Sequence, residues 1–157
     1  VYPGVQGLRG AARRSPLTLR LGLVVMSTRM NPASPSPLLG GWRIVRRLTA
    51  GIDDREPDDD DKYLWFLGHI VVTGDDFAAW HMPYSIAGSP ESGTIDVQRE
   101  DLNTPWLQQG IFSVSGDRLQ LCLSPDPGAE RPIVFSSTPD NGAVYYEAER
   151  TLKPPPR

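Results

Sequence analysis

Two histidines are the first candidates for chemistry in this sequence. His69 and His81 fall on the two strands of one predicted hairpin, so their imidazoles could lie close together, with Asp75 and Asp76 beside them. Imidazoles serve as zinc ligands and as general bases, and a neighbouring carboxylate would complete a minimal site. Nothing in the spacing requires such a site. We therefore predict ordinary surface or half-buried histidines and no metal site.

Cys122 is the second candidate, because a thiolate can act as a nucleophile. Its predicted strand carries Leu119, Leu121 and Leu123 on one face, which places Cys122 on the other face. A nucleophilic cysteine needs a base and surroundings that lower its pKa, and the local sequence supplies neither a histidine nor a helix N-terminus. Because cysteines without a disulfide are usually buried, we predict a small packed residue.

Cys122 is also the single cysteine of the chain, which limits the remaining chemistry. No internal disulfide bond and no cysteine-rich metal site can form. This composition leaves the location of the protein open while favouring the cytoplasm, where thiols stay reduced. The glycines are scattered at turns and form no phosphate-binding loop, so a nucleotide site has no support.

An acidic loop at residues 51–62 is the last candidate, as a calcium site. Calcium loops place carboxylates at alternate positions and need a glycine for their tight turn, and the run DDREPDDDD at 53–61 has neither feature. We interpret it as a solvated connection between strands. The sequence therefore predicts no catalytic residue, no metal and no cofactor, and an enzyme is the least favoured class of function.

Charge divides the chain into two parts. Residues 1–37 contain five arginines and no acidic residue, whereas residues 38–157 contain all 19 acidic residues against 11 basic ones, a net charge of −8. A body this acidic repels phosphate backbones, so nucleic acid is a disfavoured partner except for the basic arm. The length of 157 residues suits one domain with a sizeable core.

Composition further predicts three segments. Residues 1–37 are interpreted as a disordered or spurious extension that ends in the Pro/Ser linker NPASPSP at 31–37. Alternatively, the apolar run at 17–26 is a degraded signal peptide or anchor, although it is too short to span a bilayer and no membrane association is predicted. The domain itself occupies 38–153, and a proline-rich tail follows at 154–157.

Short strands joined by turns dominate the predicted domain, because 16 prolines and 15 glycines disfavour long helices. The spacing lacks βαβ units, and such an antiparallel meander removes its exposed edges by closing. We therefore predict an all-β, up-and-down antiparallel barrel of about eight strands. The predicted strands are 41–49, 63–73, 77–84, 92–98, two on either side of a turn at 115–117, 131–137 and 142–150.

Five short motifs follow one another along the domain. They are LLGGW at 38–42, GIF at 110–112, GDRLQLC at 116–122, RPIVF at 131–135 and the terminal Arg150. In order and spacing they resemble a family of small, uncharacterised planctomycete domains that is described as lipocalin-like and has no established activity. The resemblance covers about residues 38–152. The acidic loop and the aromatic segment at 80–84 depart from the family pattern.

The lipocalin resemblance implies one specific contact. In that architecture a Gly-x-Trp on the first strand closes the floor of the barrel, and an arginine from the last strand covers the indole. Gly40, Trp42 and Arg150 match these roles. A guanidinium over an indole contributes roughly 0.5–2 kcal/mol. We therefore predict that Trp42 and Arg150 are in contact and fasten the first strand to the last.

The interior of an eight-stranded barrel is either filled by side chains or holds one small ligand. Large aromatic residues are more often core than ligand cage. Arg46, on the predicted face of Trp42, and His81 would supply polar groups for an amphipathic ligand. The residues predicted to line such a pocket are Trp65, Phe77, Trp80, His81, Tyr84, Trp106 and Phe112.

Two functions consequently stay open. The first is a lipocalin-like, non-catalytic domain that binds a small apolar or amphipathic ligand inside the barrel. The second is a structural or protein-interaction module with a filled core, whose partner the sequence does not identify. An internal void that opens at the rim would favour the first function, and a barrel closed by side chains would favour the second.

Overall fold

The computed structural model describes residues 36–54, 62–68, 70–74, 79–101 and 104–156, which belong to one unit of the chain, Pro32–Arg157. The extension predicted at 1–37 lies almost wholly outside these residues. The described part contains strands and no helix. The strands are β1 (Gly40–Thr49), β2 (Ile52–Asp53), β3 (Tyr63–Leu67), β4 (Ile70–Gly74), β5 (Ala79–Gly88), β6 (Ser92–Asp101), β7 (Thr104–Ser115), β8 (Arg118–Leu123) and β9 (Val144–Thr151).

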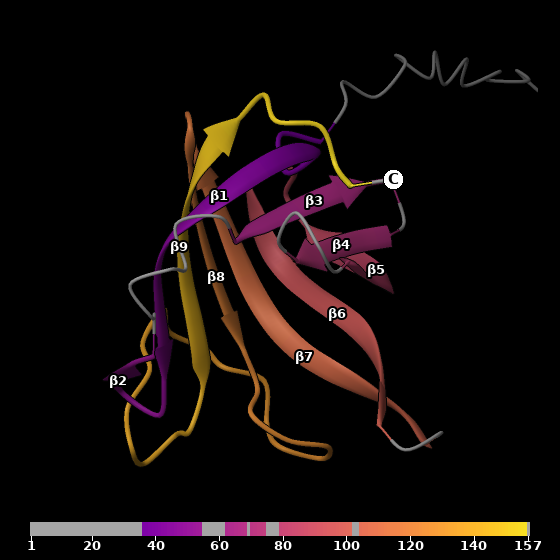
Figure 1. Ribbon diagram of the computed structural model, residues 1–157. Coiled ribbons are helices and arrows are strands. Elements are labelled where there is room, and N and C mark those ends of the chain that lie inside the picture. The colour runs from indigo at the N-terminus through magenta and orange to yellow at the C-terminus, as the bar shows by residue number, and fades with distance from the viewer. Residues whose placement is uncertain (1–35, 55–61, 69, 75–78, 102–103, 157) are drawn as a thin grey trace, which may run out of the picture. The chain divides into compact units, whose positions relative to one another are not determined.

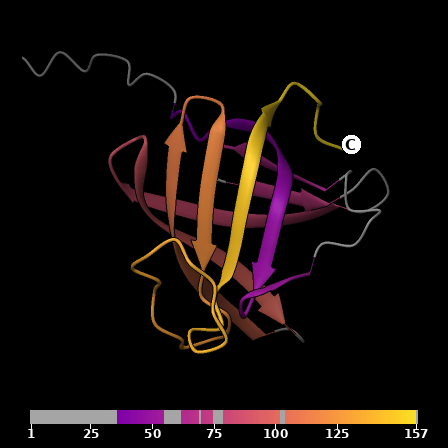
Figure 2. The same ribbon diagram turned by 90° about the vertical axis from the view of Figure 1, so that its left-hand side faces the viewer.

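These strands form one antiparallel sheet that closes on itself (Figures 1 and 2). From β3 to β9 each strand pairs with the next, and β1 pairs with β3 on one side and with β9 on the other. The two-residue β2 is an addition beside the end of β1. The predicted all-β, up-and-down barrel of eight strands is confirmed, with β2 as an extra strand.

Two predicted strands are wrong, and the errors cancel in the strand count. The segment 63–73 is divided into β3 and β4 by a turn in which Gly68 has a φ of +71°, a left-handed conformation that favours glycine. The segment 131–137 belongs to an irregular loop at 124–143. Pro132 has no N–H to donate to a ladder, and Arg131 bonds to the barrel wall, so this segment joins no strand.

Of the predicted turns, the tight hairpin at 115–117 is confirmed. Ser115 pairs with Arg118 across it, and Gly116 has a φ of +58°. The loop turn at 138–142 is also present, closed by a hydrogen bond from the Gly142 N–H to the Thr138 carbonyl at 2.9 Å. The turn predicted at Gly74 and Asp75 extends outside the described residues.

A β-bulge at Val45 interrupts the pairing of β1 with β9. Before the bulge, Ile44 is opposite Ala148, and after it Arg47 is opposite Tyr146. One extra residue in a strand reverses the alternation of side chains between the two faces of a sheet. Side chains of β1 beyond Val45 therefore lie on the face opposite to the one that simple alternation predicts.

The bulge overturns the prediction for Arg46. This side chain was expected on the face of Trp42, but it points outward and pairs with Glu147, with 3.6 Å between Nη1 and Oε1. Arg47 faces inward instead, and its guanidinium carbon lies 5.8 Å from the centre of the Tyr146 ring. The inward-facing cation of β1 is thus the next residue along the chain.

An apolar cluster fills the inside of the barrel. Every strand except β2 contributes to it, and residues alternate between buried and half-buried along the second half of β7, as expected for a wall with one dry face. Burying such side chains is the main stabilising contribution to a fold of this kind, about 1.5–3 kcal/mol for each large one. The most completely buried members are Leu38, Trp42, Phe66, Ile95, Phe112 and Leu119.

Arg150 fastens β9 to β1 at the end of the barrel where β1 begins. Its guanidinium carbon lies 3.8 Å from the centre of the Trp42 ring, so the expected contact is present. The guanidinium also donates to the carbonyls of Leu39 and Pro37, at 2.6 and 2.5 Å. The fully buried Trp42 indole donates to the Leu38 carbonyl at 2.8 Å. Together these contacts close one end of the barrel.

Gly40 is adapted to this closure by its lack of a side chain. Its φ of +107° is one that other residues rarely adopt. A Cβ at this position would also lie 3.2 Å from Nη1 of Arg150, closer than an ordinary contact. The glycine of the Gly-x-Trp pattern therefore leaves room for the guanidinium that covers the indole.

A smaller apolar cluster lies outside the barrel, beneath the loop at 124–143. Cys122 is fully buried there, and its thiol contacts the Ser136 carbonyl at 3.4 Å. Burial raises the pKa of the Cys122 thiol, and the bond to Ser136 lowers it by less. Cys122 thus lies on the face opposite the leucines of β8, as a packed residue, as predicted.

Arg131 holds this loop against the wall. Its Nη1 donates to the carbonyls of Ile95 and Gly110, at 3.2 and 2.9 Å, and its Nη2 donates to Asp96 at 2.8 Å. Two of the three acceptors are backbone groups of β6 and β7, so the anchor depends mainly on the fold of the wall.

Replacing Arg150 tests the closure. We expect Arg150→Ala to lower the free energy of unfolding by about 2 kcal/mol or more, because the cation–π contact is lost and two carbonyls lose a charged donor. Urea unfolding followed by tryptophan fluorescence measures the change. The matched control is the exposed Arg118→Ala, which should change stability by less than about 0.5 kcal/mol. Equal effects of the two substitutions would contradict the closure.

Replacing Arg131 tests the anchor of the loop. In the native protein Cys122 should react with dithionitrobenzoate at least about 100-fold more slowly than in urea, because a buried thiol with a raised pKa is protected. Arg131→Ala should speed the native reaction by about tenfold or more, as the loop opens locally. Circular dichroism checks that the barrel stays folded. An unchanged rate in a folded variant would show that Arg131 does not hold the loop.

Candidate binding site at the mouth of the barrel

Inward-facing side chains differ in polarity between the two ends of the barrel. The end closed by Trp42 is apolar, and we call it the floor. The other end, where β1, β4, β6 and β8 finish, we call the mouth. Apart from Arg150, which covers the Trp42 indole, the polar residues on the inner face gather at the mouth. They come from five different strands: Arg47, Thr73, Arg99, Gln108 and Tyr146.

Between floor and mouth lies a cavity of about 30 Å³. Apolar side chains from several strands surround it, among them Phe66, Val71, Met82 and Leu121. Pockets for drug-sized ligands usually measure roughly 300–1,000 Å³, whereas one water needs about 10–15 Å³. The described side chains therefore fill most of the interior, and a ligand of any size would have to bind nearer to the mouth.

Asp54 approaches Arg47 at the rim of the mouth. The Nε of Arg47 lies 3.5 Å from Oδ2 of Asp54, and the Thr49 hydroxyl donates to the same oxygen at 2.6 Å. Arg47 Nε and Asp54 Oδ1 are nevertheless buried without a hydrogen-bond partner among the described groups. Buried polar atoms that lack a partner cost free energy. The ion pair therefore leaves one hydrogen-bond donor of Arg47 and one acceptor of Asp54 unused.

Arg99 is held by a neutral side chain. Its Nη1 donates to Oε1 of Gln108 at 3.4 Å, a long hydrogen bond. Gln108 is itself buried, and its amide donates to the Ser124 carbonyl at 2.8 Å. The bond to Ser124 fixes the amide so that its oxygen faces Arg99. The guanidinium is thereby positioned without being neutralised by this partner.

Tyr146 lies among these charged groups. Burial raises the pKa of its hydroxyl, which outweighs the lowering by Arg47, Arg99 and Lys62, and Asp54 raises it further. The hydroxyl therefore stays protonated at neutral pH and is able to donate a hydrogen bond. The mouth offers hydrogen-bond donors and positive charge rather than a nucleophile or a general base.

Four of the residues predicted to line the interior lie on the inner face. Phe112 is buried in the core. Tyr84 packs against the core and meets the Phe66 ring edge-on, with 5.3 Å between ring centres. Trp80 shares the inner face of β5 with Tyr84, at the mouth end, where it is 70% exposed. Trp106, on β7, is opposite Arg99 of β6 and is half-buried.

Two other predicted lining residues are on the outside. Trp65 is buried, but it stacks on Tyr63 at 5.2 Å and donates to the Lys153 carbonyl at 3.0 Å, on the face opposite the core residues of β3. His81 is exposed on the outer face of β5. The C-terminal segment covers Trp65, and burial alone does not reveal which side of a wall a residue occupies. Phe77 lies outside the described residues, as does His69.

The polar residues of the mouth were missed by sequence reasoning. Arg99 and Gln108 each follow the inner-face alternation of their strands, two residues beyond Val97 and two before Gly110, so their direction was readable. They were overlooked because the predicted strands stop at 98 and resume at 110, whereas β6 continues to Asp101 and β7 begins at Thr104. Arg47 carried no such signal, since its direction depends on the bulge.

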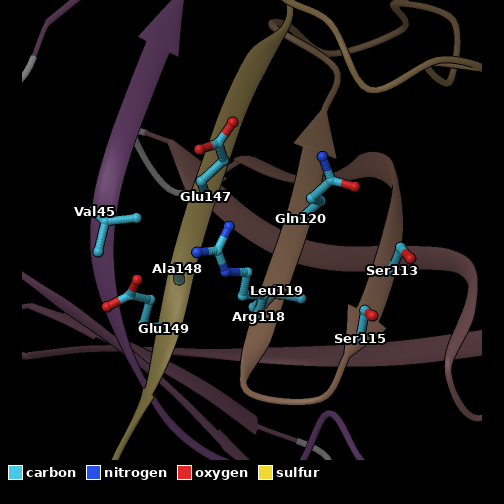
Figure 3. Close-up of a pocket in the computed structure, with 9 residues that line it drawn as sticks. All are labelled: Val45, Ser113, Ser115, Arg118, Leu119, Gln120, Glu147, Ala148 and Glu149. Atoms are coloured by element: carbon cyan, nitrogen blue, oxygen red, sulfur yellow. The ribbon is translucent and has the colours of Figure 1, made fainter.

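The outer wall carries a groove of about 390 Å³, shown in Figure 3. Three of its polar side chains have partners beside the groove: Glu149 pairs with Arg43 at 3.4 Å, and the Tyr145 hydroxyl accepts from Gln120 and donates to Glu147, at 2.8 and 3.0 Å. Exposed pairs of this kind are common on β-sheet surfaces and contribute little. This groove is a weaker candidate for a binding site than the mouth.

Within the described ranges, no three His, Cys, Asp or Glu side chains are arranged to hold a metal ion. A helix able to cross a membrane is likewise not found in the part of the chain that the structure covers. Comparison with the models of known families, with curated proteins and with solved structures found no match.

The environment of Tyr146 predicts how stability changes with pH. The pKa of Tyr146 is raised in the folded state, so its contribution is complete below the unfolded pKa near 10 and is lost as the pH rises above it. Between pH 8 and pH 10.5, Tyr146→Phe should lose less stability than the unaltered protein, by up to about 0.8 kcal/mol, the limit reached when the folded state keeps the hydroxyl protonated throughout. Urea unfolding at the two pH values measures this. Identical losses would show that the folded state does not favour the protonated hydroxyl.

Proposed function

We propose that this protein is a lipocalin-like, non-catalytic domain that binds a small amphipathic molecule at the mouth of its barrel. The observation that carries the proposal is the separation along the inner wall. Apolar side chains and the Trp42 indole covered by Arg150 form the floor, while the other polar side chains, together with the exposed Trp80, gather at the mouth. Binding sites for small molecules combine apolar walls with a few placed polar groups.

The ligand is placed at the mouth because the cavity below it measures about 30 Å³. An apolar tail would cover Trp80, whose side chain is 70% exposed although it shares the face of core residues. Trp106 lies on the same inner face, two strands away. Large apolar side chains left open to solvent often mark binding surfaces. The proposal thus replaces a deep internal ligand with a shallower one.

Family membership is part of the proposal. We place the chain in the planctomycete family whose motifs it resembles. The support is that the Gly-x-Trp pattern and the final-strand arginine, which that resemblance assigns to closure, meet as Trp42 and Arg150 at 3.8 Å. A shared closure supports a common architecture and assigns no ligand.

A protein-interaction module is the second candidate, and one observation favours it. In the loop at 124–143, Ile133 is 90% exposed and Val134 is 55% exposed, while Arg131 anchors the loop to the wall. A fixed loop that presents apolar side chains is suited to contact a protein. The interior is largely filled by side chains, which was the expectation for this second function.

An NMR titration distinguishes the two candidates. The probes are three eight-carbon amphiphiles with different head groups: octanoate, octan-1-ol and octyltrimethylammonium. We expect at least one of them to shift the indole N–H signals of Trp80 and Trp106 in a saturable manner. The indole of Trp65, on the outer wall, serves as the internal control and should not move.

Two variants sharpen this experiment. Trp80→Ala should weaken binding by about tenfold, because a large contact area is lost. Ile133→Ser, in the loop, should leave binding unchanged. The proposal is overturned if none of the three probes shifts Trp80 and Trp106, or if Ile133→Ser weakens binding as much as Trp80→Ala does.

A further inference from the structure

Cationic side chains outnumber acidic ones around Tyr146, on the inner face of the mouth. Three cationic side chains, Arg47, Arg99 and Lys62, and one carboxylate, Asp54, lie close enough to Tyr146 to act on it electrostatically. Residues 38–157 as a whole carry a net charge of −8. A local excess of positive charge inside an acidic protein attracts small anions. Charged residues on the outside keep a protein soluble, but Arg47 and Arg99 face inward and do not serve that purpose.

Arg47 retains capacity to bind a ligand. A guanidinium has five N–H donors. The described contacts of Arg47 are the ion pair from Nε to Asp54 at 3.5 Å and the face of the Tyr146 ring at 5.8 Å, and the described hydrogen bonds include none from its Nη atoms. The bulge at Val45 turns this side chain inward. On the outer face of the sheet, the same guanidinium would be better hydrated.

Arg99 has similar capacity on the facing wall. Its described partner is the neutral amide of Gln108 at 3.4 Å, and the described ion pairs do not include it. Bonds from a guanidinium to an oxyanion are shorter and about twice as strong as those to a neutral acceptor. An anion at the mouth would therefore be a better partner for Arg99 than the one it has.

We propose that Arg47 and Arg99 bind the anionic head group, a carboxylate or comparable oxyanion, of an amphipathic ligand whose apolar tail lies against Trp80 and Trp106. This inference rests on the proposed function and specifies the chemistry of its ligand. Tyr146 donates a hydrogen bond to the same head group. Because burial raises the pKa of Tyr146, the hydroxyl keeps the proton that it donates.

The affinities of the three eight-carbon probes test the charge of the head group. Octanoate should bind at least about tenfold more tightly than octan-1-ol, and octyltrimethylammonium should bind most weakly. Raising the ionic strength from 0.02 to 0.3 M should weaken octanoate binding several-fold and leave octan-1-ol unaffected. Titrations followed by the Trp80 and Trp106 indole signals give all three constants.

Substitutions locate the anion site. Arg47→Gln and Arg99→Gln should each reduce the affinity for octanoate by about tenfold or more, without changing that for octan-1-ol. Arg43→Gln removes a guanidinium of the outer wall and is the matched control, with no change expected. If a Gln variant does not fold, Arg47→Lys or Arg99→Lys keeps the charge and should retain a preference for octanoate.

The possible failures are distinguishable. If octan-1-ol binds at the mouth as tightly as octanoate does, the anion site is refuted and the proposed function stands. Equal losses of octanoate and octan-1-ol binding in the Arg47 and Arg99 variants would also refute the site, because they would indicate a structural role for both arginines. If no probe binds at the mouth, the proposed function fails and the anion site fails with it.

Discussion

The pairing of the first strand with the last is the constraint on which the structure depends. It closes the sheet, so that each strand of the barrel has a neighbouring strand on both sides. Along this seam, Trp42 meets Arg150 near the floor, and Arg47 meets Tyr146 near the mouth. Trp42 and Arg47 are an odd number of positions apart, so alternation alone would place them on opposite faces. The bulge at Val45 brings both to the inner face and gives one strand a buried indole and an inward cation.

The same seam explains why the interior is both filled and asymmetric. Near the floor, the covered indole and its apolar neighbours leave no room for a ligand, and the cavity above them measures about 30 Å³. Near the mouth, Arg47, Arg99 and Tyr146 offer donors that their described partners satisfy incompletely. Filling the core stabilises the barrel, whereas unsatisfied polar groups cost stability. A ligand that completes these interactions would account for their presence.

The fold was predictable from sequence because turn residues and a period of two in hydrophobicity suffice to identify a closed antiparallel meander. The predicted number of strands is correct despite two local errors. The turn at Gly68 divides one predicted strand into two, and the segment 131–137 is not a strand. The site was less predictable. Alternation shows which residues share a face but not which face is inside when both are buried, and so Trp65 was assigned to the wrong side. The bulge has no residue signature, because Val45 is an ordinary strand former, and so Arg46 was chosen in place of Arg47.

Side-chain nuclear Overhauser contacts across the seam test the account most directly. With β1 bulged at Val45, the ring protons of Tyr146 should show contacts to the δ-protons of Arg47 and none to those of Arg46. Contacts from the Tyr146 ring to Arg46, with none to Arg47, would mean that β1 continues without a bulge. In that case the cation proposed for the mouth would face solvent, and the separation of floor and mouth would lose its basis.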